Sequence, residues 1–167
     1  DYRTTEDRFQ REREGTLHFA TMLKEHNVRY NWQSDWDFLL AVESFDDGSD
    51  TNGKNIVQYL AEDLNVSIDP HSHEKAGYNY ADVAYRMSRL GVTPSGVVGC
   101  LIAEPPEDSK LEYLWELKRG KTFPTYQWSP QVLWGGGTSL HIDEEALWIS
   151  GIWRPQDNEH YDTHDNK

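Results

Sequence analysis

Residues 55–102 read NIVQYLAEDLNVSIDPHSHEKAGYNYADVAYRMSRLGVTPSGVVGCLI, and the order of patterns in this stretch decides the fold class. Apolar residues recur at helical spacing over 55–64, which predicts an amphipathic helix. The sequence 66–69 predicts a short strand, and a second helix follows over 79–90 before a glycine ends it. The run 96–102 is typical of a strand buried on both faces of a parallel sheet. Helix, strand, helix and strand in this order predict βα units.

The flanking sequence extends the same pattern. A helix is predicted over 4–25 and a short strand follows it, whereas the apolar stretch 36–45 fits either a helix or a buried strand. Further on, 109–118 predicts a helix and 147–153 predicts short strands, with an aromatic, glycine-rich region between them. We therefore expect one α/β domain over residues 1–167, built on a parallel sheet flanked by helices. Its strands are expected near Val28–Trp32, Val66–Asp69 and Val97–Ile102.

Composition narrows the classes of function. The chain has 167 residues, with 16 Lys and Arg against 29 Asp and Glu, so its formal net charge is −13. A surface this acidic repels phosphate backbones, which argues against nucleic acid as the main partner. Seven Trp and nine Tyr are too many for a disordered acidic tail, so a packed body is expected. No apolar run is long enough for a membrane span, and the single cysteine, Cys100, excludes both an internal disulfide and a cysteine-based zinc site.

The sharpest local feature is the segment Asp69–Glu74, which reads DPHSHE and follows a predicted strand. Ligands bind at this edge of parallel α/β folds because loops from several strands converge there. Imidazoles with nearby carboxylates are the usual ligands of catalytic zinc, iron, cobalt or nickel. His71 and His73 lie on the same side of an extended strand, about 7 Å apart. They bind one ion only if their side chains converge, and the alternative is a loop in which the surrounding protein satisfies both.

Weaker candidates lie elsewhere in the chain. Asp46-Asp47-Gly48 resembles an acidic metal-binding turn, but a plain surface loop is the favoured interpretation. His141 follows glycine-rich sequence and is a candidate cleft residue, whereas His18 and His26 are expected at the surface. Sugar stacking and core packing explain Trp128, Trp134 and Trp153 equally well. His160 and His164 lie four residues apart near the end of the chain, where a solvated tail is the favoured interpretation.

The segment 55–102 resembles the middle of a NodB-type polysaccharide deacetylase, a family in the glycoside hydrolase/deacetylase barrel superfamily. Members carry His-Ser/Thr-x-x-x-His after a strand, then a helix that ends in Leu-Gly, then a further strand. Here His71-Ser72 begins the motif, Leu90-Gly91 ends the helix, and the run 96–102 follows. The resemblance implies a (β/α) barrel. Such a barrel needs roughly 200 residues or more, so this chain is expected to form an incomplete or distorted one. Either the chain is a fragment of a longer protein, or its barrel is pared down, or the likeness is only architectural.

The sequence departs from the family pattern at three places. Lys75 occupies the position of the second motif histidine, so His73 or Glu74 would have to replace it. The family's Asp-Asp pair follows the first strand, and Asp46-Asp47 lies too close to His71 to match it, so its counterpart is expected upstream of residue 1. The family's Arg-x-Pro motif is replaced by AEPP at 103–106, without an arginine.

The resemblance implies a metal-dependent hydrolase that removes acyl groups from an amino sugar or a related glycan. His71 and His73 would bind a divalent metal, zinc being the expected ion. Asp69 or Glu74 would be a further ligand or the base that deprotonates water. His141 or His164 would be the acid that protonates the leaving group.

Two other classes of function stay open. One is a non-catalytic carbohydrate-binding or scaffold domain that retains part of a hydrolase fold, favoured by Lys75 and by the abundance of tryptophan. The other is a structural or interaction domain in which the His-Ser-His segment is an ordinary loop. An incomplete barrel would expose an edge strand and apolar surface, so we also expect partner binding or self-association as a homo-oligomer.

Overall fold

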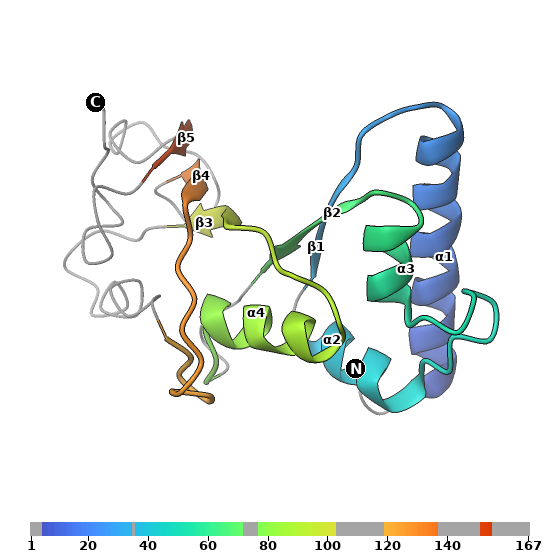
Figure 1. Cartoon of the computed structure of the whole chain (residues 1–167), viewed down its shortest axis with the longest axis horizontal. Helices are drawn as coiled ribbons and strands as arrows, with labels where there is room; N and C mark the ends of the chain where they lie inside the picture. Colours follow the sequence, from blue (N-terminus) through green and yellow to red (C-terminus); the bar gives the residue numbers. More distant parts are fainter. Residues whose placement is uncertain (1–4, 35, 72–76, 103–118, 137–150, 155–167) are drawn as a thin grey trace.

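The computed structural model describes residues 5–34, 36–71, 77–102, 119–136 and 151–154. Its elements are α1 (Glu6–Glu25), β1 (Asn31–Ser34), α2 (Trp36–Phe45), α3 (Ile56–Glu62), β2 (Ser67–Pro70), α4 (Tyr80–Arg89), β3 (Val97–Ile102), β4 (Val132–Gly136) and β5 (Gly151–Trp153). Figure 1 shows α1 and α3 side by side to one side of β1 and β2, with β3, β4 and β5 to the other. The fold is mixed α/β, as predicted. The helix expected over 109–118 lies outside the described residues.

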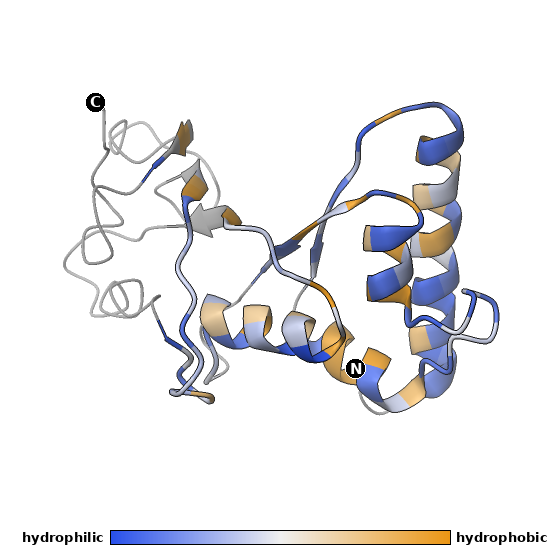
Figure 2. Cartoon of the chain, viewed as in Figure 1, coloured by the Kyte–Doolittle hydropathy of each residue, from blue (hydrophilic) through white to orange (hydrophobic). Residues whose placement is uncertain are grey.

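Helical spacing accounts for the first two helices. α1 begins directly after Thr5 and ends at Glu25, close to the predicted bounds. The undecided stretch forms α2, because its buried residues recur at the spacing of one helix face. These residues are Phe38, Leu39, Ala41 and Val42. Figure 2 shows α1 hydrophilic over most of its length, whereas α2 carries a continuous hydrophobic stretch, in keeping with its more buried position.

Reciprocal caps begin the next two helices. The Asn55 side chain accepts the N–H of Gln58 at 3.0 Å, and the Gln58 side chain accepts the N–H of Asn55 at 3.4 Å. Asn79 and Asp82 form the same capping box at the start of α4, which confirms the predicted cap. Gly91 follows α4 with a φ of 85°, a conformation that favours glycine, so its predicted role as the helix stop is confirmed as well.

β1 and β2 form a parallel pair in which Trp32 lies opposite Ile68 and Ser34 lies opposite Pro70. The parallel pairing is as predicted, but β1 begins at Asn31 rather than at Val28. The position of the partner strand explains the shift. The ladder starts where the Ser67 N–H donates to the Tyr30 carbonyl at 3.1 Å, so residues before Tyr30 have no strand opposite them within the described chain.

A second sheet has the order β3-β4-β5, with β3 and β4 parallel and β5 antiparallel to β4. The expectation that β3 shares one sheet with β1 and β2 was therefore wrong. Ser95, which precedes β3, connects the two sheets by donating its N–H to the Ile68 carbonyl at 3.1 Å. β4 was not predicted, because the glycines of its Leu-Trp-Gly-Gly sequence carry little strand signal. The described residues form no closed barrel.

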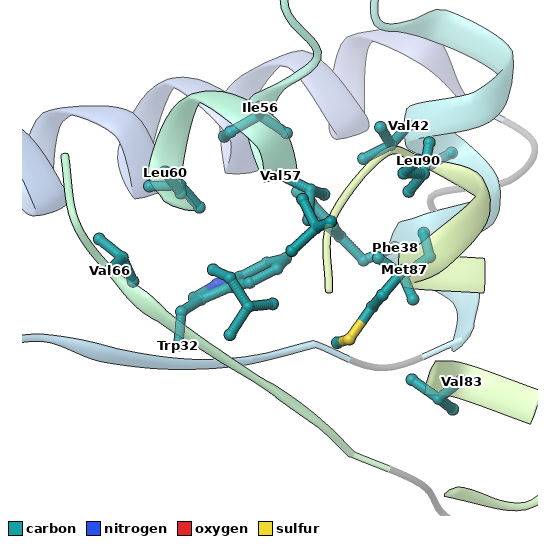
Figure 3. Packing of buried hydrophobic residues seen from close by; sticks show 14 of the residues in the cluster. Trp32, Phe38, Val42, Ile56, Val57, Leu60, Val66, Val83, Met87 and Leu90 are labelled. Atoms are coloured by element: carbon teal, nitrogen blue, oxygen red, sulfur yellow. The ribbon is translucent and has the colours of Figure 1, made fainter. Parts of the chain in front are cut away.

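The main core lies between α1, α2, α3, α4 and the β1–β2 pair. Figure 3 shows Trp32 reaching from β1 toward Val57 and Leu60 of α3, with Phe38 and Met87 beyond it. The rings of Trp32 and Phe38 meet edge to face with centroids 5.4 Å apart. This packing fixes the end of β1 and the first turn of α2, which border the candidate site. Within the described part of the chain, no helix is long and apolar enough to cross a membrane.

Candidate functional site

The carboxyl ends of β1 and β2 lie next to each other, and His71 is positioned by both. It follows Pro70 directly, and its backbone N–H donates to the Ser34 carbonyl at 2.9 Å. This bond continues the parallel ladder one residue beyond β2 and holds His71 beside the end of β1. The structure thus places His71 at the predicted edge of the parallel pair.

A pocket of about 210 Å³ opens at this edge, between α1, β1 and the first turn of α2. It is lined by Glu12, Thr16, Trp32, Gln33, Ser34, Phe38 and His71. Glu12 and Thr16 lie one turn apart on the same face of α1, while Trp32 and Phe38 are buried residues of the core. The described lining therefore combines two aromatic core residues with polar residues, His71 among them.

Gln33, one of the lining residues, carries a buried polar group. Its amide nitrogen Nε2 is buried, and within the described residues it has no hydrogen-bond partner. A buried donor in that state costs about 1 to 3 kcal/mol.

Asp69 was a candidate ligand or base, and its carboxylate lies outside the pocket lining. The side chain is buried in β2, where Oδ2 accepts the side-chain N–H of Asn31 at 2.7 Å and Oδ1 accepts the hydroxyl of Ser95. Asn31 belongs to β1, and Ser95 precedes β3. The carboxylate thus ties β2 to β1 and to the segment that precedes β3, a role that the sequence reasoning did not anticipate.

The other predicted site residues are not described by the structure. His73, Glu74 and Lys75 lie outside the described residues, and so does His141. The convergence of His71 and His73 therefore stays a prediction. Among the residues that the structure describes, no group of three or more His, Cys, Asp or Glu is placed to hold a metal ion.

The other candidates that the structure describes do not line the pocket. His18 and His26 are exposed at α1 and its end, as predicted. Trp128 is half-buried and Trp134 is exposed, and neither lines the pocket. The tail histidines His160 and His164 are outside the described residues, and so is the side chain of Trp153.

The Asp46-Asp47-Gly48 turn is neither a metal site nor a plain surface loop. It lies between α2 and α3, where Asp46 Oδ1 is 3.0 Å from Arg13 Nε and Oδ2 accepts the Ile56 N–H at 2.7 Å. Asp50 binds the same guanidinium through both oxygens, at 2.9 Å from Nη1 and 2.5 Å from Nη2. The loop thus fastens α1 to the start of α3 around a buried arginine.

The electrostatics of this cluster favour the charged forms of Arg13 and Asp50. The hydrogen bonds from Arg13 lower the pKa of Asp50 from its ordinary value of 3.8. The same pairing with Asp50, aided by Asp46, raises the pKa of Arg13 even though burial opposes it. Bidentate pairing of this kind is the strong form of an ion pair, so the cluster is structural rather than a vacant ligand site.

The sequence reasoning missed what α1 and β1 contribute to the site. Glu12 and Thr16 belong to a helix with no motif, and Gln33 and Ser34 were assigned to no function. One signal was available: Ser34 is followed by Asp35, an acidic residue directly after a strand, just as His71 directly follows β2. Asp35 itself lies outside the described residues.

Comparisons with known proteins add no assignment. No protein-family model matches the chain, and no curated protein or solved structure is significantly similar to it.

Proposed function

We propose that this protein is a metal-dependent hydrolase of the polysaccharide deacetylase type, which removes acyl groups from an amino sugar or a related glycan. In this proposal the two small sheets are part of an incomplete or distorted (β/α) barrel. The observation that carries it is the position of His71, which follows β2, lines a pocket, and is bonded through its backbone to the end of the parallel neighbour β1. Catalytic side chains gather at this edge in parallel α/β enzymes.

The residues at this edge suit a divalent ion of the zinc class, which takes imidazole and carboxylate ligands. His71 and His73 would hold the ion, with Glu74 or Asp69 as a further ligand or as the base that takes a proton from water. Asp35 joins them as a candidate ligand, because neighbouring parallel strands end side by side and it directly follows β1.

When bound, the ion would polarise the acyl carbonyl and lower the pKa of a water molecule. The carboxylate base would take the proton of that water as it attacks the carbonyl carbon. His141 would then donate a proton to the leaving amine. Of the two candidate bases, Glu74 is favoured, because both oxygens of Asp69 accept hydrogen bonds from Asn31 and Ser95.

The Asp69 carboxylate is occupied by hydrogen bonds from Asn31 and Ser95. This structural role also favours the second candidate function, a non-catalytic carbohydrate-binding domain that retains part of a hydrolase fold. Lys75 in place of the second motif histidine points the same way. The two candidates differ in metal content and in turnover, and both can be measured on the same protein.

The test is metal analysis of the full chain after removal of bound ions and reloading with Zn²⁺. We expect about one zinc per chain for the wild type, with acetate released from acetylated amino-sugar oligomers. His71→Ala and His73→Ala should lose both. His18→Ala is the matched control, since His18 is exposed on α1 and does not line the pocket. A wild-type chain that takes up no zinc and releases no acetate would contradict the hydrolase; sugar binding in that case would support the second candidate.

A further inference from the structure

We propose that Trp36, Tyr78 and Arg86 are positioning residues of the candidate site. Trp36 and Tyr78 fasten together the two chain segments that leave the carboxyl ends of β1 and β2, and Arg86 orients Trp36. The three residues thereby hold His71 in place. This inference rests on the proposed function in one respect, since it names what would set the geometry of the metal site. The contacts that carry it are all made by described residues.

The chain segments that leave the two parallel strands meet again at one aromatic contact. Trp36 begins α2, two residues after β1 ends at Ser34, whereas Tyr78 follows β2 and lies two residues before α4. The rings of Trp36 and Tyr78 are stacked, with an interplanar angle of 9° and centroids 4.8 Å apart. This separation lies in the favourable range for aromatic pairs. The stack therefore joins the start of α2 to the approach to α4.

The stack gives the chain after β2 a second point of attachment to the β1 side. The first point is His71, whose backbone N–H donates to the Ser34 carbonyl at 2.9 Å. The second is Tyr78, stacked on Trp36. A chain fastened at two points has less conformational freedom than a chain fastened at one. Loss of the stack is therefore expected to loosen His71.

The loop that leads toward β4 supports the same contact. The Thr122 hydroxyl donates to the carbonyl of Gly77 at 3.3 Å, directly before Tyr78. The ring centroid of Phe123 lies 6.1 Å from that of Trp36. Both members of the stack thus have a neighbour in this loop, which limits how far either can move away.

Arg86 of α4 holds the Trp36 ring by its charge and by its partner on α2. Its Cζ lies 4.1 Å from the Trp36 ring centroid and 5.6 Å from that of Phe123, within the roughly 6 Å over which a ring attracts a cation. Its Nη1 donates to Glu43 Oε2 at 2.6 Å, and Figure 1 shows α2 and α4 side by side. Arg86 Nε is buried without a hydrogen-bond partner in the described chain, so ring contacts are a large share of what holds this guanidinium.

The test follows the His71 amide, because its bond to Ser34 reports the sheet edge and does not depend on a bound metal. Hydrogen exchange is measured by NMR on the full chain after removal of metal with EDTA. Trp36→Leu and Tyr78→Leu are expected to speed exchange at His71 about three- to tenfold, because each removes the aromatic stack. Urea denaturation of each variant gives its global stability for comparison.

Phe19→Leu is the matched control. It removes another aromatic pair, the edge-to-face contact of Phe19 with Tyr30, whose centroids are 5.3 Å apart. That pair lies before the start of β1 rather than at its carboxyl end. Exchange at His71 should therefore stay at the wild-type rate in Phe19→Leu.

Conservative variants separate positioning from simple loss of packing. Trp36→Phe keeps a ring opposite Tyr78 and should restore most of the protection of the His71 amide. Arg86→Met removes the cation and should speed that exchange about threefold. Arg86→Lys keeps a positive charge beside Trp36 and should stay closer to the wild type than Arg86→Met does.

Zinc titration of the same variants connects this inference to the proposed function. If the wild type binds zinc, Trp36→Leu and Tyr78→Leu should weaken its affinity about tenfold, as loss of a group that orients a metal ligand does. Trp36→Phe should restore the affinity, and Phe19→Leu should leave it unchanged.

The outcomes separate this inference from the hydrolase. A wild type that takes up no zinc, with faster His71 exchange in the stack variants alone, would support the positioning role and contradict the hydrolase. Zinc bound equally tightly by the wild type and both stack variants would overturn the positioning role and leave the hydrolase standing. Exchange at His71 that does not rise in the stack variants, or that rises equally in Phe19→Leu, would also overturn it.

Discussion

Arg13 illustrates what a single buried charge does in this molecule. Its side chain is 6% exposed and its partner Asp46 is 1% exposed, whereas Asp50 is 57% exposed. Arg13 also donates to the Thr51 hydroxyl at 3.2 Å, so its guanidinium meets three partners of the loop between α2 and α3. The buried contact with Asp46, rather than the more exposed contact with Asp50, should dominate the contribution of this network to stability.

Arg13→Met is expected to lower the free energy of unfolding by about 3 to 5 kcal/mol, because it leaves the buried Asp46 carboxylate without its charge partner. Urea denaturation followed by circular dichroism measures the change. Arg11→Ala is the control: Arg11 is exposed on the same helix, and its replacement should cost no more than about 0.5 kcal/mol. Equal effects of the two substitutions would contradict the structural role of the cluster.

The same cluster predicts a pH dependence. Hydrogen bonds from Arg13 lower the pKa of Asp50 in the folded state, so the stabilisation is present above its ordinary value of 3.8 and is lost as the pH falls through the lower, folded-state pKa. The stability difference between wild type and Arg13→Met should therefore shrink in acid, below about pH 4. Because Asp50 is largely exposed, we expect a modest effect that salt reduces. A difference that stays constant between neutral pH and roughly pH 3 would rule out this linkage.

At the scale of elements, Asp82 connects α4 to a distant loop. Its buried carboxylate accepts the N–H of Asn79 in the capping box and also the N–H groups of Lys121, Thr122 and Phe123, at 2.9 to 3.0 Å. Phe123 in turn packs on Tyr85, with ring centroids 4.3 Å apart. One side chain thus caps a helix and holds the loop that leads toward β4.

Asp82→Asn should release that loop, because an amide has one acceptor atom where the carboxylate offers two, and its NH₂ would face backbone donors. We expect a loss of about 3 kcal/mol in the free energy of unfolding and faster hydrogen exchange at the amides of Thr122 and Phe123. Asp7→Asn, in the first turn of α1, should cost at most about 1 kcal/mol and leave those amides protected. Unchanged exchange in Asp82→Asn would show that the loop is held by other contacts.

Helices were predictable here because their signals are local. The Asn79–Asp82 cap, the Gly91 stop and the length of α1 follow from residues close together in the chain. Strands depend on a partner, and so β1 started later than its sequence suggested and β4 was missed. The buried role of Asp82 toward residues 121–123 was likewise invisible, since it depends on contacts some forty residues away.

At the scale of the whole molecule, some residues of the candidate site could be predicted from the sequence and others could not. His71 was identified from the sequence because it directly follows a predicted strand and belongs to the His-Ser-His segment. Glu12, Gln33 and Phe38 were not, because they meet only where α1, β1 and α2 pack together. Asp69 looked like a ligand beside His71, yet the strand pairing turns it toward Asn31 and Ser95. Sequence order thus located the edge of the sheet, and packing determined which side chains share the pocket.

The outer edge of β1 leads to a prediction about assembly. Tyr30 and Ser34 direct their carbonyls to β2, so the backbone groups of Asn31 and Gln33 face the other way, where no described strand pairs with them. Apolar side chains stay exposed on α1 and in the segment leading into β1: Phe19 is 44% exposed, Met22 38% and Val28 51%. Open strand edges beside apolar surface favour association with another chain.

We expect the sedimentation coefficient of the wild-type chain to rise with protein concentration. The rise should be greater at high salt, since copies that each carry a formal net charge of −13 repel one another and salt screens that repulsion. A double substitution, Met22→Lys and Val28→Lys, should weaken the association by placing charge on the apolar surface next to the edge. Ile152→Lys is the control, because Ile152 is 79% exposed but belongs to β5 in the other sheet. A wild-type chain that sediments as a compact monomer over a wide concentration range, at low and at high salt, would show that this edge does not bind a second copy.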